Sequence, residues 1–151
     1  MRRGIFAGLA ALAVAGVIAA PVFTKSSTAA PAPKSIKFST SIPEALKLAA
    51  KSKKPVFIDF GAEWCGPCKK MLNETYKDPT IVSRAEGFIS VYIDIDKQPK
   101  VAEKYKVEAV PTVVFLDSTG KVVNQSIGFL NVQKFGKLMD ESKAKATTKT
   151  K

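Results

Sequence analysis

The chain's two cysteines, Cys65 and Cys68, lie three positions apart and give the first chemical signal in the sequence. A disulfide between them would close a very small ring, so it would add little stability through ring closure. At the first turn of a helix the two sulfurs come within bonding distance. The N-terminal sulfur then faces unpaired N–H groups and the positive end of the helix dipole, which favour a thiolate. We therefore expect Cys65 to attack a substrate disulfide and Cys68 to resolve the mixed disulfide.

The residues around the cysteines complete the pentapeptide Trp-Cys-Gly-Pro-Cys. Gly66 lets the backbone of a partner approach, and Pro67 stiffens the turn at a helical position where its missing N–H costs little. Trp64 offers a flat apolar face beside the first sulfur, although an ordinary core aromatic is the alternative for this residue. We expect all three residues to contact the substrate.

The composition excludes several other kinds of catalytic site. The chain has no histidine, which excludes Cys-His and Ser-His catalysis and every metal site that contains histidine. Two cysteines cannot complete a four-thiolate zinc site within one chain, which leaves open a half-site completed by a second protomer. We expect no bound metal and no cofactor.

The net charge of +11 is spread unevenly along the 151 residues. Between Ser35 and Asp140 there are 16 Lys and Arg against 12 Asp and Glu, so most of the excess lies in the terminal segments. Nucleic-acid binding would need a basic stripe on one face, whereas these lysines fit a solvated surface. We expect no nucleic-acid partner and, from the length and a hydrophobic content of 46%, one globular domain.

Residues 1–24 have the pattern of a membrane-targeting segment. Arg2 and Arg3 precede an uncharged, mostly apolar run that ends before Lys25 and that would extend ~31 Å as a helix, about the thickness of a bilayer's hydrocarbon core. Both a cleaved signal peptide and a retained membrane anchor fit this run. In either case the rest of the chain is expected to be exported. Residues 25–34 are small, polar and proline-containing, and are predicted to form a spacer.

Residues 35–141 show the changing periodicity of a single domain, whereas residues 142–151 lack apolar periodicity and are predicted to be a disordered basic tail. Strands are predicted at residues 55–60, 88–95, 111–116 and 121–127, with an optional strand near Ile36, and helices at 41–49, 65–76, from 78, at 99–105 and after 131. This order predicts an α/β fold with a central mixed β-sheet flanked by helices on both faces.

The stretch from Val56 to Lys69 resembles the strand, active-site loop and helix of the thioredoxin family. The full pentapeptide at the end of a strand is a specific signal, whereas Cys-x-x-Cys alone would be weak. The resemblance runs from about Ile36 to Asp140 and implies the thioredoxin fold for residues 35–141.

A second part of the resemblance concerns the substrate groove. Val110-Pro111-Thr112 is similar to the family's cis-proline loop, and Gly128 matches a later glycine of the same groove. The resemblance implies that Pro111 is cis and that these residues contact substrate. The Val110 backbone would then pair with an extended substrate peptide as one added strand.

Asp59 is an acid inside an otherwise apolar strand. Burial should raise its pKa, and the resemblance implies that it accepts and donates the proton of Cys68 as a third catalytic residue. A structural carboxylate with satisfied hydrogen bonds is the alternative. Cytoplasmic thioredoxins commonly carry a lysine near this acid, and the matching residue here is Tyr92, which leaves the tuning of Asp59 open.

Residues 73–82 form a longer segment than in a minimal thioredoxin. They are more similar to exported thioredoxin-like domains such as the C-terminal domain of the transmembrane thiol:disulfide interchange proteins. Gly-Pro between the cysteines is typical of reductants in the family, whereas strong oxidants and isomerases usually place a histidine there.

The sequence therefore predicts an extracytoplasmic or periplasmic thiol:disulfide oxidoreductase that reduces disulfides of exported proteins. We expect a monomer that is recharged by a membrane thiol electron donor, because the compartment is oxidising. Two alternatives stay open: a dithiol oxidase, and a redox-linked peptide-binding or chaperone module.

Overall fold

The computed structural model describes residues 35–148. The predicted targeting segment at 1–24, the spacer at 25–34 and residues 149–151 of the predicted tail lie outside the described residues. Within residues 35–148, no helix combines the length and the apolar character that crossing a bilayer requires.

Helices and strands alternate along the described chain largely as predicted. In order they are α1 (Ile42–Ser52), β1 (Val56–Gly61), α2 (Gly66–Asn73), the 3₁₀ helix η1 (Thr75–Lys77), α3 (Pro79–Ala85), β2 (Ile89–Asp94), α4 (Pro99–Lys104), β3 (Thr112–Leu116), β4 (Val122–Ile127) and α5 (Val132–Thr148). Local sequence explains the helix starts. Ser41 Oγ accepts the Glu44 N–H at 3.4 Å before α1, and Asp78 Oδ1 accepts the Thr80 N–H at 2.8 Å before α3.

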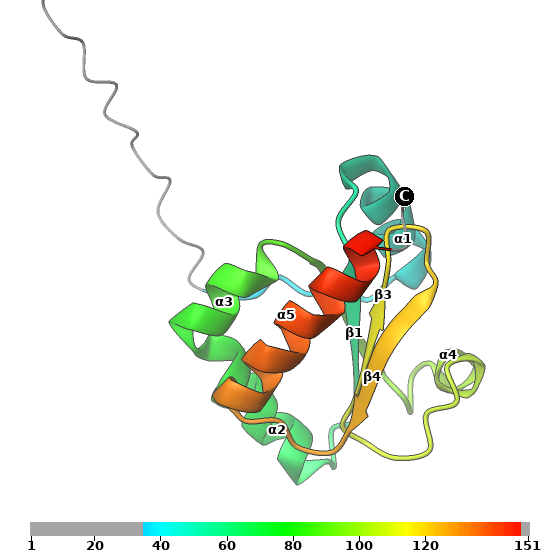
Figure 1. Ribbon diagram of the computed structural model, residues 1–151. Coiled ribbons are helices and arrows are strands. Elements are labelled where there is room, and N and C mark those ends of the chain that lie inside the picture. Colours follow the sequence, from blue (N-terminus) through cyan, green and yellow to red (C-terminus); the bar gives the residue numbers. More distant parts are fainter. Residues whose placement is uncertain (1–34, 149–151) are drawn as a thin grey trace, which may run out of the picture. The chain divides into compact units, whose positions relative to one another are not determined.

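The four strands form one mixed sheet in the order β2-β1-β3-β4. Strand β1 pairs in parallel with β2 and antiparallel with β3, and β3 pairs antiparallel with β4. Because side chains alternate along a strand, Ile58 and Phe60 pack with residues of α1 and α4, while Phe57 packs with residues of α3 and α5. Figure 1 shows α3 and α5 on one side of the sheet and α4 on the other. The predicted mixed sheet with helices on both faces is confirmed.

The helix predicted at residues 65–76 is shorter in the structure. Helix α2 ends at Asn73 and the 3₁₀ turn η1 follows, in which the buried Thr75 hydroxyl donates to the Leu130 carbonyl oxygen at 2.8 Å. This hydrogen bond holds the turn in place, and the next residue, Tyr76, is buried against Phe135 of α5. The optional strand near Ile36 is also absent from the described chain, where the segment makes an isolated bridge between Ser39 and Val91.

The prediction of a disordered tail from residue 142 is wrong for residues 142–148. Helix α5 continues to Thr148 because its buried side extends beyond Met139. Ser142 is fully buried, donates from its hydroxyl to the Leu138 carbonyl oxygen at 2.6 Å and accepts from Asn124 Nδ2 at 3.1 Å, and Ala146 is also buried. Small side chains at helical spacing therefore hold this lysine-rich segment against the domain.

Candidate active site

The two cysteines lie at the start of α2, which follows β1 through the active-site loop. Cys65 is the N-cap of α2, and a disulfide joins it to Cys68 with the two Cα atoms 5.3 Å apart. The Cys68 backbone N–H donates to the Cys65 sulfur at 3.1 Å. The helix start thus offers the Cys65 sulfur the donor that a thiolate needs, as the sequence predicts. Cys65 is 3% exposed and Cys68 is fully buried, so Cys65 is the sulfur nearer to solvent.

Trp64 is not a core aromatic. Its side chain is 67% exposed, and its indole Nε1 donates to Asp96 Oδ2 at 2.8 Å. Gly66 and Pro67 are exposed beside it. Asp96 was not predicted as a site residue, although it follows the parallel strand β2 at the edge of the sheet where the active-site loop leaves β1. The exposed indole therefore has a fixed orientation next to the buried sulfurs.

The cis-proline loop faces the cysteines. The Val110–Pro111 peptide bond is cis, and the half-buried Val110 packs against Cys65 and Cys68. The Thr112 hydroxyl donates to the Ala109 carbonyl oxygen at 2.7 Å. The loop that contains Pro111 and Thr112 thus meets the disulfide through Val110.

Gly128 is held to the same loop. Its backbone N–H donates to the Pro111 carbonyl oxygen at 2.8 Å, and its φ of +95° lies in the left-handed region that favours glycine. The segment after β4 is therefore fixed to the cis-proline loop through the backbone.

Asp59 is fully buried on the face of β1 that α2, α3 and α5 cover. Burial raises its pKa to about 7, and the nearby Tyr76 hydroxyl opposes this rise without reaching hydrogen-bond geometry. Within residues 35–148 neither carboxyl oxygen has a hydrogen-bond partner. Among the described residues the acid is therefore buried without a hydrogen bond, and its pKa is suited to proton transfer near neutral pH.

Two tyrosines accompany this acid. Tyr92 of β2 is the register partner of Asp59, and its pKa is raised to about 12, first by burial and then by the negative charge of Asp59. Tyr76 of η1 is buried, and burial followed by the Asp59 charge raises its pKa well above the usual value. The sequence placed Tyr92 near the acid correctly but missed Tyr76, although Tyr76 lies in the segment recognised as longer than in a minimal thioredoxin.

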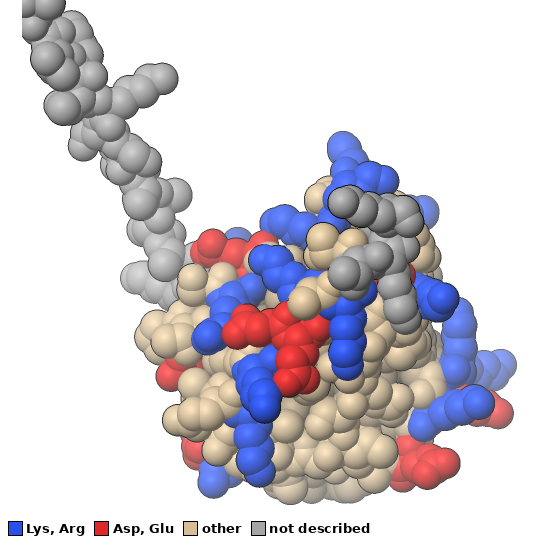
Figure 2. All heavy atoms as spheres, in the orientation of Figure 1, with Lys and Arg blue, Asp and Glu red and all other residues tan. Residues whose placement is uncertain are grey.

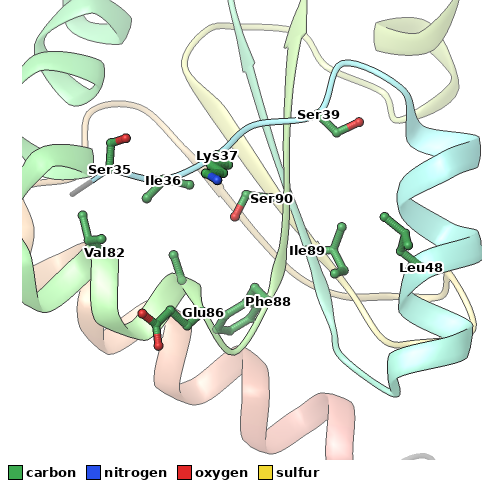
Figure 3. A pocket seen from close by; sticks show the side chains of 11 residues that line it. Ser35, Ile36, Lys37, Ser39, Leu48, Val82, Glu86, Phe88, Ile89 and Ser90 are labelled. Carbon is green, nitrogen blue, oxygen red and sulfur yellow. The ribbon is translucent and has the colours of Figure 1, made fainter. Parts of the chain in front are cut away.

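A groove of about 320 Å³ is lined by residues that do not include the cysteines (Figure 3). It is lined by the segment 35–39 and by residues of α1, α3 and β2, with Ile36, Phe88 and Ile89 among its apolar residues. The lining contains neither cysteine nor Asp59, so this groove is separate from the redox site.

The described residues hold no group of three or more His, Cys, Asp or Glu arranged to bind a metal ion. On the face seen in Figure 2, Lys and Arg are interspersed with Asp and Glu. Near the site, Lys97 Nζ pairs with Glu63 at 2.7 Å and with Asp94 at 3.3 Å. The rim beside Trp64 thus carries both signs of charge.

The chain matches the family model of the thioredoxin-like domain over residues 42–143. The thiol:disulfide interchange protein DsbD of Pectobacterium atrosepticum is 30% identical over 148 residues, which cover 89% of this chain and only 26% of that protein's length. Thioredoxin H5 of Arabidopsis thaliana is 38% identical over 88 residues, which cover 56% of this chain and 69% of that protein.

Solved structures agree with this similarity. A thioredoxin from Thermus thermophilus matches with a TM-score of 0.66 and 25% identity, over 74% of this chain and 91% of that chain. A structure described as DsbH oxidoreductase matches with a TM-score of 0.62 and 20% identity, over 79% of this chain and 90% of that chain. The latter likeness concerns the fold alone. The predicted thioredoxin fold is confirmed.

Proposed function

Because this chain belongs to the thioredoxin-like domain family and is a thiol:disulfide oxidoreductase, we propose that it acts as a reductase of protein disulfides outside the cytoplasm. The observation that carries the proposal is the Cys65 sulfur at the start of α2, which accepts the Cys68 N–H and lies beside an exposed tryptophan and a cis-proline loop. This arrangement stabilises a thiolate where an extended peptide can reach it.

The residues of this site account for every electron and proton in a reduction cycle. The Cys65 thiolate attacks one sulfur of the substrate disulfide, whose S–S bond breaks while the other sulfur leaves with the electron pair. Asp59 takes the proton of the Cys68 thiol, and the Cys68 thiolate then attacks the Cys65 sulfur. A Cys65–Cys68 disulfide forms, the second substrate thiolate leaves, and two electrons have passed to the substrate.

The residues between the cysteines, and the lack of histidine in the chain, support reduction of the substrate as the direction of the reaction. Gly66 and Pro67 separate them, and the chain contains no histidine that could stabilise the thiolate as in strongly oxidising members of the family. Each cycle leaves the protein oxidised, so a membrane thiol electron donor returns the two electrons. The substrates are exported proteins with exposed disulfides, and the protein acts as a monomer.

The apolar N-terminal run supports the proposed location. Residues 1–24 serve as a signal peptide or an anchor, and residues 25–34 as a spacer in front of the catalytic domain. The similarity to the interchange protein extends over 89% of the chain. A membrane-impermeant maleimide applied to intact cells after reduction should label the exported protein, and labelling only after lysis would contradict export.

The redox state in living cells tests the direction. Cells are quenched in acid, and free thiols are then tagged with a maleimide that changes mobility on a gel. We expect Cys65 and Cys68 to be mostly reduced at steady state, and to become oxidised when the electron donor is removed. A pair that is fully oxidised at steady state would support the dithiol oxidase instead. The double variant Cys65→Ser/Cys68→Ser provides the untagged reference.

A further inference from the structure

Two side chains near the site carry buried polar atoms that have no hydrogen-bond partner among the described residues. Both carboxyl oxygens of Asp59 and the hydroxyl of Tyr76 are buried without a hydrogen bond within residues 35–148. Buried polar atoms are almost always paired in folded proteins, so an unpaired cluster needs an explanation. Here the cluster joins a buried acid to a buried donor, and a hydroxyl that donates to the ionised acid would satisfy both.

Tyr76 is held rigidly beside the acid. It reaches the α2, α3 and α5 face of the sheet from η1, and its ring packs against Phe135 at 5.1 Å and Phe38 at 5.4 Å between centroids. Each group affects the other electrostatically: the hydroxyl lowers the pKa of Asp59 relative to burial alone, and the Asp59 charge helps to raise the pKa of Tyr76. The phenol is therefore placed to stabilise the carboxylate form.

Tyr92 lies beside the same acid on the neighbouring strand β2. Its Cα pairs with that of Asp59 across the parallel strands, so the two side chains share a face of the sheet. A Cβ built on Gly61 would lie 2.5 Å from the Tyr92 hydroxyl oxygen and 3.1 Å from two of its ring carbons. The phenol thus lies over Gly61, and only glycine leaves it this space.

Tyr92 also reaches the surface. It lines a hollow of about 420 Å³ together with Glu63, Asp94 and Lys97, of which Glu63 and Lys97 are largely exposed. Asp59 itself is fully buried. The half-buried phenol therefore connects the closed environment of the acid with solvent on the far side of Gly61.

We propose that Tyr76 and Tyr92 are positioning residues for proton transfer at Asp59, Tyr76 by donating a hydrogen bond to the carboxylate and Tyr92 by relaying the proton to water. The proposal rests on the proposed role of Asp59 as the base for Cys68. It explains what replaces the lysine found near this acid in cytoplasmic thioredoxins.

The proton balance is simple. The Asp59 carboxylate takes the proton of Cys68 while the Tyr76 hydroxyl holds the carboxylate in place. The protonated acid then donates to the Tyr92 oxygen while the Tyr92 O–H proton passes to water in the hollow. Both tyrosines end as neutral phenols, and the carboxylate is restored for the next cycle.

Other titratable groups face Tyr92 and must be kept constant in a test. They are Asp59 from β1, Tyr76 from η1, Glu63 from the active-site loop, Asp94 from β2 and Lys97 from the loop after β2. The tyrosine variants below therefore remove only a hydroxyl group and leave these charged groups in place. Tyr105→Phe is the matched control, because Tyr105 is half-buried on the other face of the sheet and packs against Phe60 at 5.6 Å.

The first test follows the rate at which Cys68 resolves a preformed mixed disulfide between Cys65 and a reporter thiol, as a function of pH. In the parent protein this rate should rise with an apparent pKa near 7. Tyr76→Phe should move that pKa upward by about one unit, so that the rate at pH 6 falls about tenfold and recovers at high pH. A pKa unchanged from the parent in Tyr76→Phe would overturn its role.

Tyr92→Phe should act differently. We expect the rate to fall by about threefold to tenfold across the whole pH range, less than the ~10²-fold or more that a direct general acid or base contributes. Imidazole buffer should restore the rate, because an added base can accept the proton that the phenol would relay. Gly61→Ala should lower the rate in the same way by displacing the phenol. A parent-like rate in both variants, or loss that buffer does not restore, would overturn the relay. Tyr105→Phe should change neither the pKa nor the rate.

A second readout is independent of substrate and direction. The Asp59 carboxyl can be titrated by carbon-13 NMR in the oxidised protein, with thermal unfolding of each variant as a check on folding. Tyr76→Phe should raise this pKa by the same amount as in the kinetic test. If it does so while Asp59→Asn resolves mixed disulfides at the parent rate, the base role of Asp59 fails and the tyrosine coupling stands.

Discussion

The two faces of β1 are equally buried but differ in how their atoms are satisfied. On one face Ile58 and Phe60 pack among apolar residues of α1 and α4. On the other, Asp59 and Gly61 follow Phe57, and the acid has no hydrogen-bond partner in the described part of the chain. The first face is therefore apolar at Ile58 and Phe60. The second face carries a buried carboxyl group that lowers stability near the active-site loop.

The aromatic residues also differ along the face that carries the acid. Phe57 at the start of β1 packs against Phe135 at 5.7 Å and Phe88 at 6.0 Å, and these rings carry no polar atoms. The Phe57 ring also lies 6.3 Å from that of Tyr76, and at Asp59, two residues later, the neighbouring phenols are those of Tyr76 and Tyr92. The difference between the faces is thus concentrated at the end of the strand that leads to Cys65.

Removing a ring from the apolar face should have the largest effect on stability. Phe60→Ala deletes a fully buried side chain and should lower the free energy of unfolding by about 3–5 kcal/mol. The rate of disulfide exchange per folded molecule should change little, because Phe60 points away from the acid. Chemical denaturation and an insulin reduction assay below the transition measure the two quantities, and a matching loss of rate would break the contrast between the faces.

The opposite change in stability is expected on the other face. Asp59→Leu removes a carboxyl group that is costly to ionise in the fold and should raise the free energy of unfolding at pH 8 by about 2–4 kcal/mol. Exchange should slow because Cys68 loses its base. Denaturation at pH 8 and single-turnover kinetics check both effects, and a variant that is less stable than its parent at pH 8 would show that the carboxylate is satisfied in the folded protein.

The pH dependence of stability should reveal the same acid. The pKa of Asp59 is raised from 3.8 to about 7 in the folded protein, so between these values the folded state holds a proton that the unfolded state has lost. The stability that this proton adds to the folded protein is fully present below pH 4 and is lost as pH rises through 7. Between these values the free energy of unfolding falls by about 1.4 kcal/mol per pH unit. Subtracting the unfolding curve of Asp59→Leu at each pH isolates it, and a flat difference would contradict the raised pKa.

The smallest stability effect is expected at the exposed rim. Trp64→Ala should change the free energy of unfolding by no more than about 0.5 kcal/mol, because the side chain is 67% exposed. The KM for a protein substrate should rise by about fivefold to tenfold, since an exposed aromatic beside the nucleophile contributes to binding. Steady-state kinetics measure this rise. Asp96→Asn keeps an acceptor for the indole and should have a smaller effect on KM, and equal effects would contradict a binding role for the ring.

Much of the active-site strand and of the helix that follows it can be predicted from local sequence. The pentapeptide follows an apolar strand and opens a helix, so Cys65 at the N-cap and Asp59 inside the core could both be placed in advance. The cis bond before Pro111 also agrees with the resemblance. In each of these cases the signal lies within a few consecutive residues.

The missed features depend on packing between distant segments. Tyr76 and Asp96 belong to elements that meet the active-site strand only through the fold, and no spacing within their own segments indicates a function. The helical structure of residues 142–148 was missed because alanine is the only apolar residue type there and the other residues are Lys, Ser and Thr. The signal was the position of Ser142 and Ala146, which continue the buried side of α5 at helical spacing beyond Met139.

The central claim, that Cys65 attacks substrate disulfides and Cys68 releases the product, is tested most directly by trapping. Cys68→Ala is incubated with a protein that contains accessible disulfides, and adducts are separated on a non-reducing gel. We expect a covalent adduct that is joined through Cys65 and cleaved by dithiothreitol, and no adduct with Cys65→Ala, whose remaining thiol is fully buried. No adduct with Cys68→Ala, or equal adducts with both variants, would contradict it and favour a peptide-binding module.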